Sequence, residues 1–115
     1  MTTLYGIPNC DTVKKARIWL EQHSIDFTFH DFRKDGLEAS TVKAWCARID
    51  WETLVNKRST SWKKIDEATR NNLCRDNVAA LLVAYPTLIK RPVLDNTNIL
   101  AVGFNADHYQ QLFAR

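Results

Sequence analysis

The stretch LYGIPNCDT (residues 4–12) joins a predicted strand to a predicted helix. Short apolar alternation predicts the strand over residues 3–6, and Gly6 and Pro8 favour a tight loop directly after it. The apolar positions that follow recur at helical spacing: Val13, Ala16 and Leu20. The candidate helix caps are Asn9, Asp11 and Thr12. Cys10 is therefore expected at or beside the first turn of a helix that ends near residues 23–24.

This position bears on the chemistry of the Cys10 thiol. The first turn of a helix has unpaired N–H groups and the positive end of the helix dipole, which together favour an anion. A cysteine there forms its thiolate more readily than a free cysteine does. Lys14 and Lys15 add positive charge one turn on, whereas the Asp11 carboxylate opposes it. The alternative is a cysteine that only packs between strand and helix, and the residues favour a reactive thiol.

Length and charge limit the class of protein. A chain of 115 residues is expected to form a single domain over residues 1–115, with one core. The formal net charge of +3 is too small by itself to indicate direct nucleic-acid binding. The sequence has no apolar run like that of a signal peptide or a membrane span. We expect a cytoplasmic monomer that binds no membrane.

The cysteines and histidines indicate neither a disulfide framework nor a metal site. Cys10, Cys46 and Cys74 form an odd, widely spaced set, which favours a reducing compartment. Val13 stands three residues after Cys10, so the chain has no CxxC pair there. The three histidines have no ligand spacing with the cysteines, and we therefore expect no metal. Cys46 is expected to be a small core residue, and Cys74 has no evident role.

The rest of the pattern predicts the order of the elements. Residues 25–30 alternate as a half-buried strand, which makes the first three elements a βαβ unit with parallel strands. A turn is predicted next, at residues 33–36. The middle of the chain is predicted to be helical, with helices at residues 42–49, 51–55, 67–75 and 78–85, and Asn77 is expected to cap the last of them. The most basic stretch, residues 56–64, is expected to be a solvated loop unless an anion binds near it.

The C-terminal third predicts a β-hairpin and a last helix. Its two strands are expected within residues 87–94 and 99–102, with an Asp/Asn turn between them, and Asn105 is a suitable cap for the helix. The order β-α-β … β-β-α defines an α/β fold. We predict a thioredoxin-like core with a helical insertion between the second and third strands, at roughly residues 37–86.

The chain resembles the ArsC/Spx family, whose founding members are arsenate reductases, and it is most similar to the YffB-like subgroup of thiol reductases. The matching segments follow the family order across nearly the whole chain: YGIPNCDTVKKA (5–16), HDFR (30–33), LVNKR (54–58) and LIKRPV (88–93). The resemblance implies the thioredoxin-like fold and Cys10 as the nucleophile. It also implies an anion or substrate pocket, whose candidate residues are Asn9, Lys14, Arg58, Arg91 and Pro92. In such folds a cis-proline lies beside the reactive sulfur, so we predict a cis Arg91–Pro92 bond.

Several positions depart from the arsenate reductases of the family. Those enzymes have His four residues before the cysteine and Arg four after it, where this chain has Gly6 and Lys14. Those enzymes also have three anion-binding arginines. In this chain the first corresponds to about Asn56, where Arg58 could replace it, and the second corresponds to Arg91. The third corresponds to about Val102. A small oxyanion needs several charge-assisted donors around it. The missing cation at Val102 therefore makes arsenate reductase proper a weaker hypothesis.

Two functions from different classes remain. In the first, the chain is a monothiol oxidoreductase in which Cys10 attacks an oxidised or electrophilic substrate, and glutathione or a glutaredoxin-like protein resolves the adduct. In the second, the chain is a non-enzymatic partner of RNA polymerase, as Spx-like members are. That subgroup typically has a redox CxxC, which this chain lacks. We favour the enzyme, with glutathione as cosubstrate.

Overall fold

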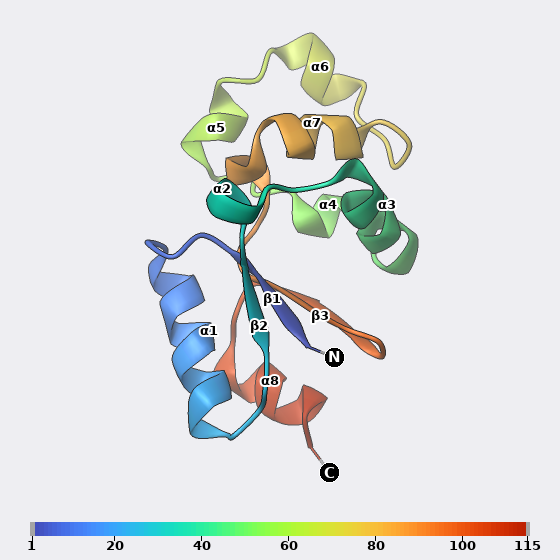
Figure 1. Cartoon of the computed structure of the whole chain (residues 1–115). Coiled ribbons are helices and arrows are strands. Elements are labelled where there is room, and N and C mark those ends of the chain that lie inside the picture. The colour runs from blue at the N-terminus through green and yellow to red at the C-terminus, as the bar shows by residue number, and fades with distance from the viewer. Residues whose placement is uncertain (1, 115) are drawn as a thin grey trace. The chain divides into compact units, whose positions relative to one another are not determined.

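The computed structural model describes residues 2–114 and divides into two compact units, which we treat one at a time (Figure 1). The first unit comprises the chain up to Gly36 together with the chain from Arg91 onward. The second unit comprises Leu37–Lys90. No helix within residues 2–114 is long and apolar enough to span a membrane.

Four strands of the first unit form one sheet. They are β1 (Thr3–Gly6), β2 (Thr28–Asp31), β3 (Val93–Asn96) and β4 (Ile99–Val102), in the spatial order β2-β1-β3-β4. The β1–β2 pair is parallel, and the β1–β3 and β3–β4 pairs are antiparallel. The parallel first pair and the β3–β4 hairpin confirm the predicted thioredoxin-like α/β core.

Two helices cover one face of this sheet. They are α1 (Asp11–Gln22) and α8 (Ala106–Leu112). The strand residues of this face include Leu4 and Leu94, which are paired partners and therefore point to the same side. They form one buried core with residues of the two helices: Ala16, Trp19, Leu20 and Tyr109. Asn105 caps α8 as predicted, because its side chain accepts a hydrogen bond from the His108 N–H at 3.1 Å.

The second unit is helical. Its elements are α3 (Ala39–Arg48), α4 (Trp51–Leu54), α5 (Thr60–Lys63), α6 (Glu67–Asn71), α7 (Val78–Ala84) and the 3₁₀ turn η1 (Pro86–Leu88). The helix α3 packs against α7, and Val42, Trp45 and Cys46 form its buried side. Cys46 is thus a core residue, as expected. The basic stretch is only partly a loop, because Ser59 caps α5 through the Trp62 N–H at 3.1 Å.

Several local predictions were wrong; the strand expected at residues 25–30 begins only at Thr28, and the helix expected at residues 67–75 ends at Asn71. The expected turn at residues 33–36 is the end of a short helix, α2 (Phe32–Asp35), because Asp31 caps it by accepting from the N–H groups of Arg33 and Lys34. The expected strand at residues 87–94 begins only at Val93, since η1 occupies its first part.

Asn77 precedes α7, but its side chain makes no capping bond to any described N–H group of that helix. The side-chain oxygen (Oδ1) of Asn77 instead accepts a hydrogen bond from the Cys74 backbone N–H at 2.7 Å. The amide group is therefore used to close the preceding loop.

Candidate active site at the start of α1

Cys10 is the N-cap residue of α1, with extended backbone angles (φ −94°, ψ 124°). Its carbonyl accepts the first helical bond from the Lys14 N–H at 3.0 Å, and its own N–H donates to the Ile7 carbonyl at 3.4 Å. The sulfur makes no capping hydrogen bond with any residue that the structure describes. The N-cap assignment confirms the position predicted for Cys10, whose thiol is free and partly exposed.

Gly6 sets how closely the loop packs on α1. A Cβ atom at Gly6 would lie 2.8 Å from Cγ2 of Val13, a fully buried residue one turn into the helix. That distance is well inside van der Waals contact, so a side chain at position 6 requires Val13 to move. Glycine therefore allows the end of β1 to approach α1, and this approach fixes the loop that carries Cys10.

Arg91 and Pro92 lie at the sheet edge where β1 ends. Tyr5 is paired with Val93 in an antiparallel register, so the residues that follow β1 and those that precede β3 lie at the same edge. The Arg91–Pro92 bond is cis, as predicted. Pro92 is buried, and its carbonyl accepts from the Gly103 N–H at 2.8 Å.

The Arg91 guanidinium has an unused donor. Its Nη1 atom is buried and has no hydrogen-bond partner among residues 2–114. A buried guanidinium nitrogen without an acceptor costs free energy, and an anionic group that accepts from it removes that cost. Arg91 is therefore suited to bind a carboxylate or an oxyanion at this edge.

Val102 occupies the β4 position directly opposite Val93. Paired residues point to the same face of the sheet, so Val102 shares a face with Val93 and Tyr5. An apolar side chain at this position provides no donor for an anion.

The structure places the remaining predicted residues separately. Asn9 is exposed in the loop before α1, and Lys14 is exposed on α1, where it lines a shallow hollow with Arg17, Ile18 and Glu21. Arg58 belongs to the second unit, is exposed, and donates its backbone N–H to the Asn56 side-chain oxygen at 3.2 Å. Its role beside Cys10 stays a prediction.

Sequence reasoning did not single out Tyr5 and His30, which form a cross-strand pair on the face of Val102. Their rings lie 4.8 Å apart, and His30 Nε2 donates to the Gly36 carbonyl at 2.6 Å. Burial, with a smaller contribution from the Asp95 charge, raises the pKa of the Tyr5 phenol. The strand alternation could have found them, because it puts Tyr5 on the face opposite the core residue Leu4.

The other two cysteines differ from Cys10 in their surroundings. Cys46 is 4% exposed, and burial raises the pKa of its thiol, although the charge of Arg75 partly opposes this. Cys74 is exposed and lies before α7. Within residues 2–114, no group of three or more His, Cys, Asp and Glu side chains is arranged to hold a metal ion.

The first unit thus combines a thioredoxin-like sheet with a free cysteine at the start of its first helix. The family model described as the ArsC family matches residues 5–112, and the chain belongs to this family. A solved structure of a protein called YFFB is 39% identical, covers 99% of this chain and 100% of its own, and superposes with a TM-score of 0.93.

Two further relatives indicate the range of functions in the family. An arsenate reductase (ArsC) related protein from Brucella melitensis is 45% identical, with 99% of this chain and 95% of that chain covered and a TM-score of 0.76. The global transcriptional regulator Spx 1 of Oceanobacillus iheyensis is 31% identical, with 100% of this chain and 88% of the regulator covered. The family thus includes both reductase-like proteins and regulators.

Proposed function

We propose that the protein is a monothiol oxidoreductase that uses Cys10 as its nucleophile and glutathione as its reducing cosubstrate. The observation that carries the proposal is the free, partly exposed thiol at the N-cap of α1. The position three residues further on is the fully buried Val13, so the motif that supplies a second thiol in CxxC proteins is absent from this loop. In this proposal the resolving thiol comes from another molecule.

The reaction balances as two thiol–disulfide exchanges. The Cys10 thiolate attacks the glutathione sulfur of a mixed disulfide, the substrate leaves as a thiolate that takes up a proton, and Cys10 becomes glutathionylated. A second glutathione thiolate then attacks the glutathione sulfur of this adduct. Oxidised glutathione leaves, and the Cys10 thiolate is regenerated. Overall, one mixed disulfide and one glutathione thiol become the substrate thiol and one oxidised glutathione.

The residues around Cys10 have supporting roles in this proposal. Glutathione carries carboxylates, and the unpartnered Nη1 of Arg91 would donate to one of them. Lys14 and Asn9 would contribute a positive charge and a polar contact, and Pro92 would hold the adjacent backbone. The family resemblance assigns Arg58 to the same anion, with a weaker effect.

The test is an assay in which the protein reduces a glutathione mixed disulfide. A coupled reductase measures the oxidised glutathione that is formed. We expect Cys10→Ser to abolish turnover. Arg91→Ala should lower kcat/KM by about tenfold, the loss of one charge-assisted hydrogen bond. Arg58→Ala should have a smaller effect, and added salt should lower the wild-type rate. Arg33→Ala, an exposed arginine on α2, is the matched control. Equal rates for wild type and Cys10→Ser would refute the proposal.

The second candidate function is regulation through RNA polymerase. It is favoured by the match of a transcriptional regulator, Spx 1, along the whole of this chain. Affinity capture of purified RNA polymerase by the immobilised protein tests it directly. Saturable binding by an enzymatically inactive protein would favour this function, and turnover without polymerase binding would favour the oxidoreductase.

A further inference from the structure

The second unit contains a cavity lined by two tryptophans and two cations. Its volume is about 310 Å³, and its lining residues are Trp51, Lys57, Trp62, Glu67, Arg70 and Asn71. They come from α4, α5, α6 and the segment between α4 and α5. The volume is at the low end of the range for small-molecule sites. A site here involves none of the residues proposed to act with Cys10, and the inference does not depend on the proposed function.

Both cations lie over the same indole ring. The Cζ atom of Arg70 is 5.8 Å from the centre of the Trp62 ring, and the Nζ atom of Lys57 is 6.0 Å from it. The ring attracts each cation, and an anion that binds in the cavity is attracted to the same two charges.

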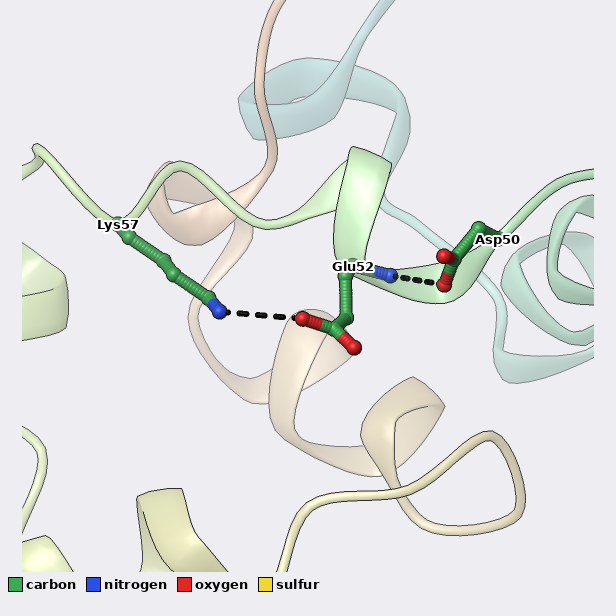
Figure 2. A network of polar contacts seen from close by, with 3 residues as sticks. All are labelled: Asp50, Glu52 and Lys57. Atoms are coloured by element: carbon green, nitrogen blue, oxygen red, sulfur yellow. Dashed lines mark hydrogen bonds and ion pairs between the residues drawn. The ribbon is translucent and has the colours of Figure 1, made fainter.

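The two cations differ in their existing partners. Lys57 donates to the Glu52 carboxylate at 3.2 Å, and Figure 2 shows this pair beside the cap that Asp50 makes on the Glu52 N–H. For Arg70, the Nε atom is buried without a hydrogen-bond partner in residues 2–114, and the guanidinium interacts electrostatically with the Asp66 carboxylate. The nearby Asp66 carboxylate accepts from the Thr69 N–H at 3.0 Å and the Thr69 hydroxyl at 2.6 Å. The cavity therefore presents one guanidinium that has an unused Nε donor, while Asp66 partly offsets its charge.

We propose that this cavity binds a small aromatic carboxylate, with the ring against Trp51 and Trp62 and the carboxylate on Arg70. The two indoles favour a planar apolar ring, and the buried Arg70 Nε lacks an acceptor that a carboxylate provides. Glu67 also lines the cavity, and its negative charge opposes the ligand. Asn71 can donate from its amide group to the second carboxylate oxygen.

The probe is 2-naphthoate, with 2-naphthalenemethanol as its neutral counterpart, and the readout is the tryptophan indole N–H signals in a ¹H–¹⁵N spectrum. The chain has four tryptophans. Naphthoate should shift the signals of Trp51 and Trp62 saturably and leave those of Trp19 and Trp45 in place. Trp45 is fully buried, and Trp19 lines a different cavity, so both serve as internal references. The alcohol should bind at least about tenfold more weakly.

Variants distinguish the contribution of the Arg70 charge to naphthoate binding from that of the tryptophan rings. Arg70→Met should weaken naphthoate about tenfold, while Arg75→Met, an exposed arginine of the same unit, should leave it unchanged. If Arg70→Met does not fold, Glu67→Gln provides the test, because loss of the opposing charge should tighten binding. Equal binding of acid and alcohol, a first response at Trp19, no saturation at millimolar probe, or no tightening in Glu67→Gln would overturn the proposal.

Discussion

Cys10 and Cys74 are both accessible thiols, but their local structures differ. Cys10 caps a helix of 12 residues, whereas Cys74 lies in the loop before α7. We expect iodoacetamide at neutral pH to label Cys10 about tenfold faster than Cys74, because cysteines at the start of a helix are generally the more nucleophilic. Cys46 should react most slowly, since it is 4% exposed and burial raises the pKa of its thiol. Peptide mass spectrometry over time measures all three rates, and equal rates at Cys10 and Cys74 would show that exposure alone governs labelling.

Tyr109 is a second residue with an unusual environment. Its ring is fully buried among Trp19, Phe104 and Phe113, and its hydroxyl has no hydrogen-bond partner within the described chain. We expect Tyr109→Phe to raise the free energy of unfolding by about 1 kcal/mol at pH 7, because it removes an unsatisfied buried hydroxyl at almost constant volume. Urea denaturation measures this change. A loss of more than about 1 kcal/mol would mean that the hydroxyl has a partner in solution, such as a buried water.

The same residue predicts a pH dependence. Burial raises the pKa of the Tyr109 phenol, so the folded chain keeps this proton when the unfolded chain begins to lose it near pH 10. The free energy of unfolding is therefore unaffected by this ionisation below that pH and falls as the pH rises further, because only the unfolded chain gives up the proton. The wild type should therefore lose more stability between pH 9 and about 11 than Tyr109→Phe does. The remaining dependence would include Tyr5, whose pKa is also raised.

Some residues of the candidate site could be placed from the sequence, and others could not. The Gly6 and Pro8 loop and the helical repeat after it were enough to place Cys10 at the start of α1. They did not identify the cap, because Asn9, Asp11 and Thr12 all have capping side chains, yet Cys10 takes the N-cap position. The unpartnered nitrogen of Arg91 could not be predicted, since it depends on which atoms pack around the guanidinium.

At the scale of elements, the packing of β1 against α1 depends on Gly6. Gly6→Ala should lower the free energy of unfolding by about 1–3 kcal/mol, because the new methyl group would lie 2.8 Å from Val13 Cγ2. Thermal or urea unfolding measures it. Gly36→Ala is a useful comparison, because a Cβ there meets none of the described atoms within 4 Å and the cost comes only from its positive φ of 77°.

A double-mutant cycle gives the control for this prediction. Val13→Ala removes the methyl groups that Gly6→Ala would meet, although it leaves a small cavity of its own. The double variant should therefore lose less stability than the sum of the two single losses. Strict additivity would show that the backbone moves apart without contact between the two side chains.

The elements that sequence reasoning missed are those that depend on distant backbone bonds. Residues 87–89 (Thr-Leu-Ile) have the composition of a strand. However, the backbone N–H of Asn56 donates to the Leu88 carbonyl, and the backbone N–H of Lys90 donates to the Leu54 carbonyl, both at 2.7 Å. These bonds use the backbone groups that a longer strand would need, and Ile89 forms only an isolated bridge with Val55. In contrast, α1, α3 and α8 have periodic apolar faces or a side-chain cap, and the local sequence was sufficient to predict them.

At the scale of the whole molecule, the proposed oxidoreductase raises the question of whether it would accept arsenate. The first unit combines Cys10, Arg91 and an apolar Val102 along connected strands and loops, and it has glycine where arsenate reductases have histidine. Placing histidine at position 6 would bring its Cβ against Val13. A small oxyanion needs several converging donors and Val102 provides none, whereas a large cosubstrate with separate carboxylates needs fewer of them.

We therefore expect the wild type to show little or no arsenate reduction with glutathione and glutaredoxin present. Val102→Arg should increase arsenate binding, because position 102 pairs with Val93 and an arginine there can extend its charged end toward the edge at which Arg91 lies. Val102→Leu is the matched control, since it changes volume without adding charge. Isothermal titration with arsenate measures binding, and arsenite formation measures turnover. Efficient arsenate reduction by the wild type, or equal arsenate binding by the Arg and Leu variants, would mean that the cation missing at position 102 does not explain the specificity of this chain.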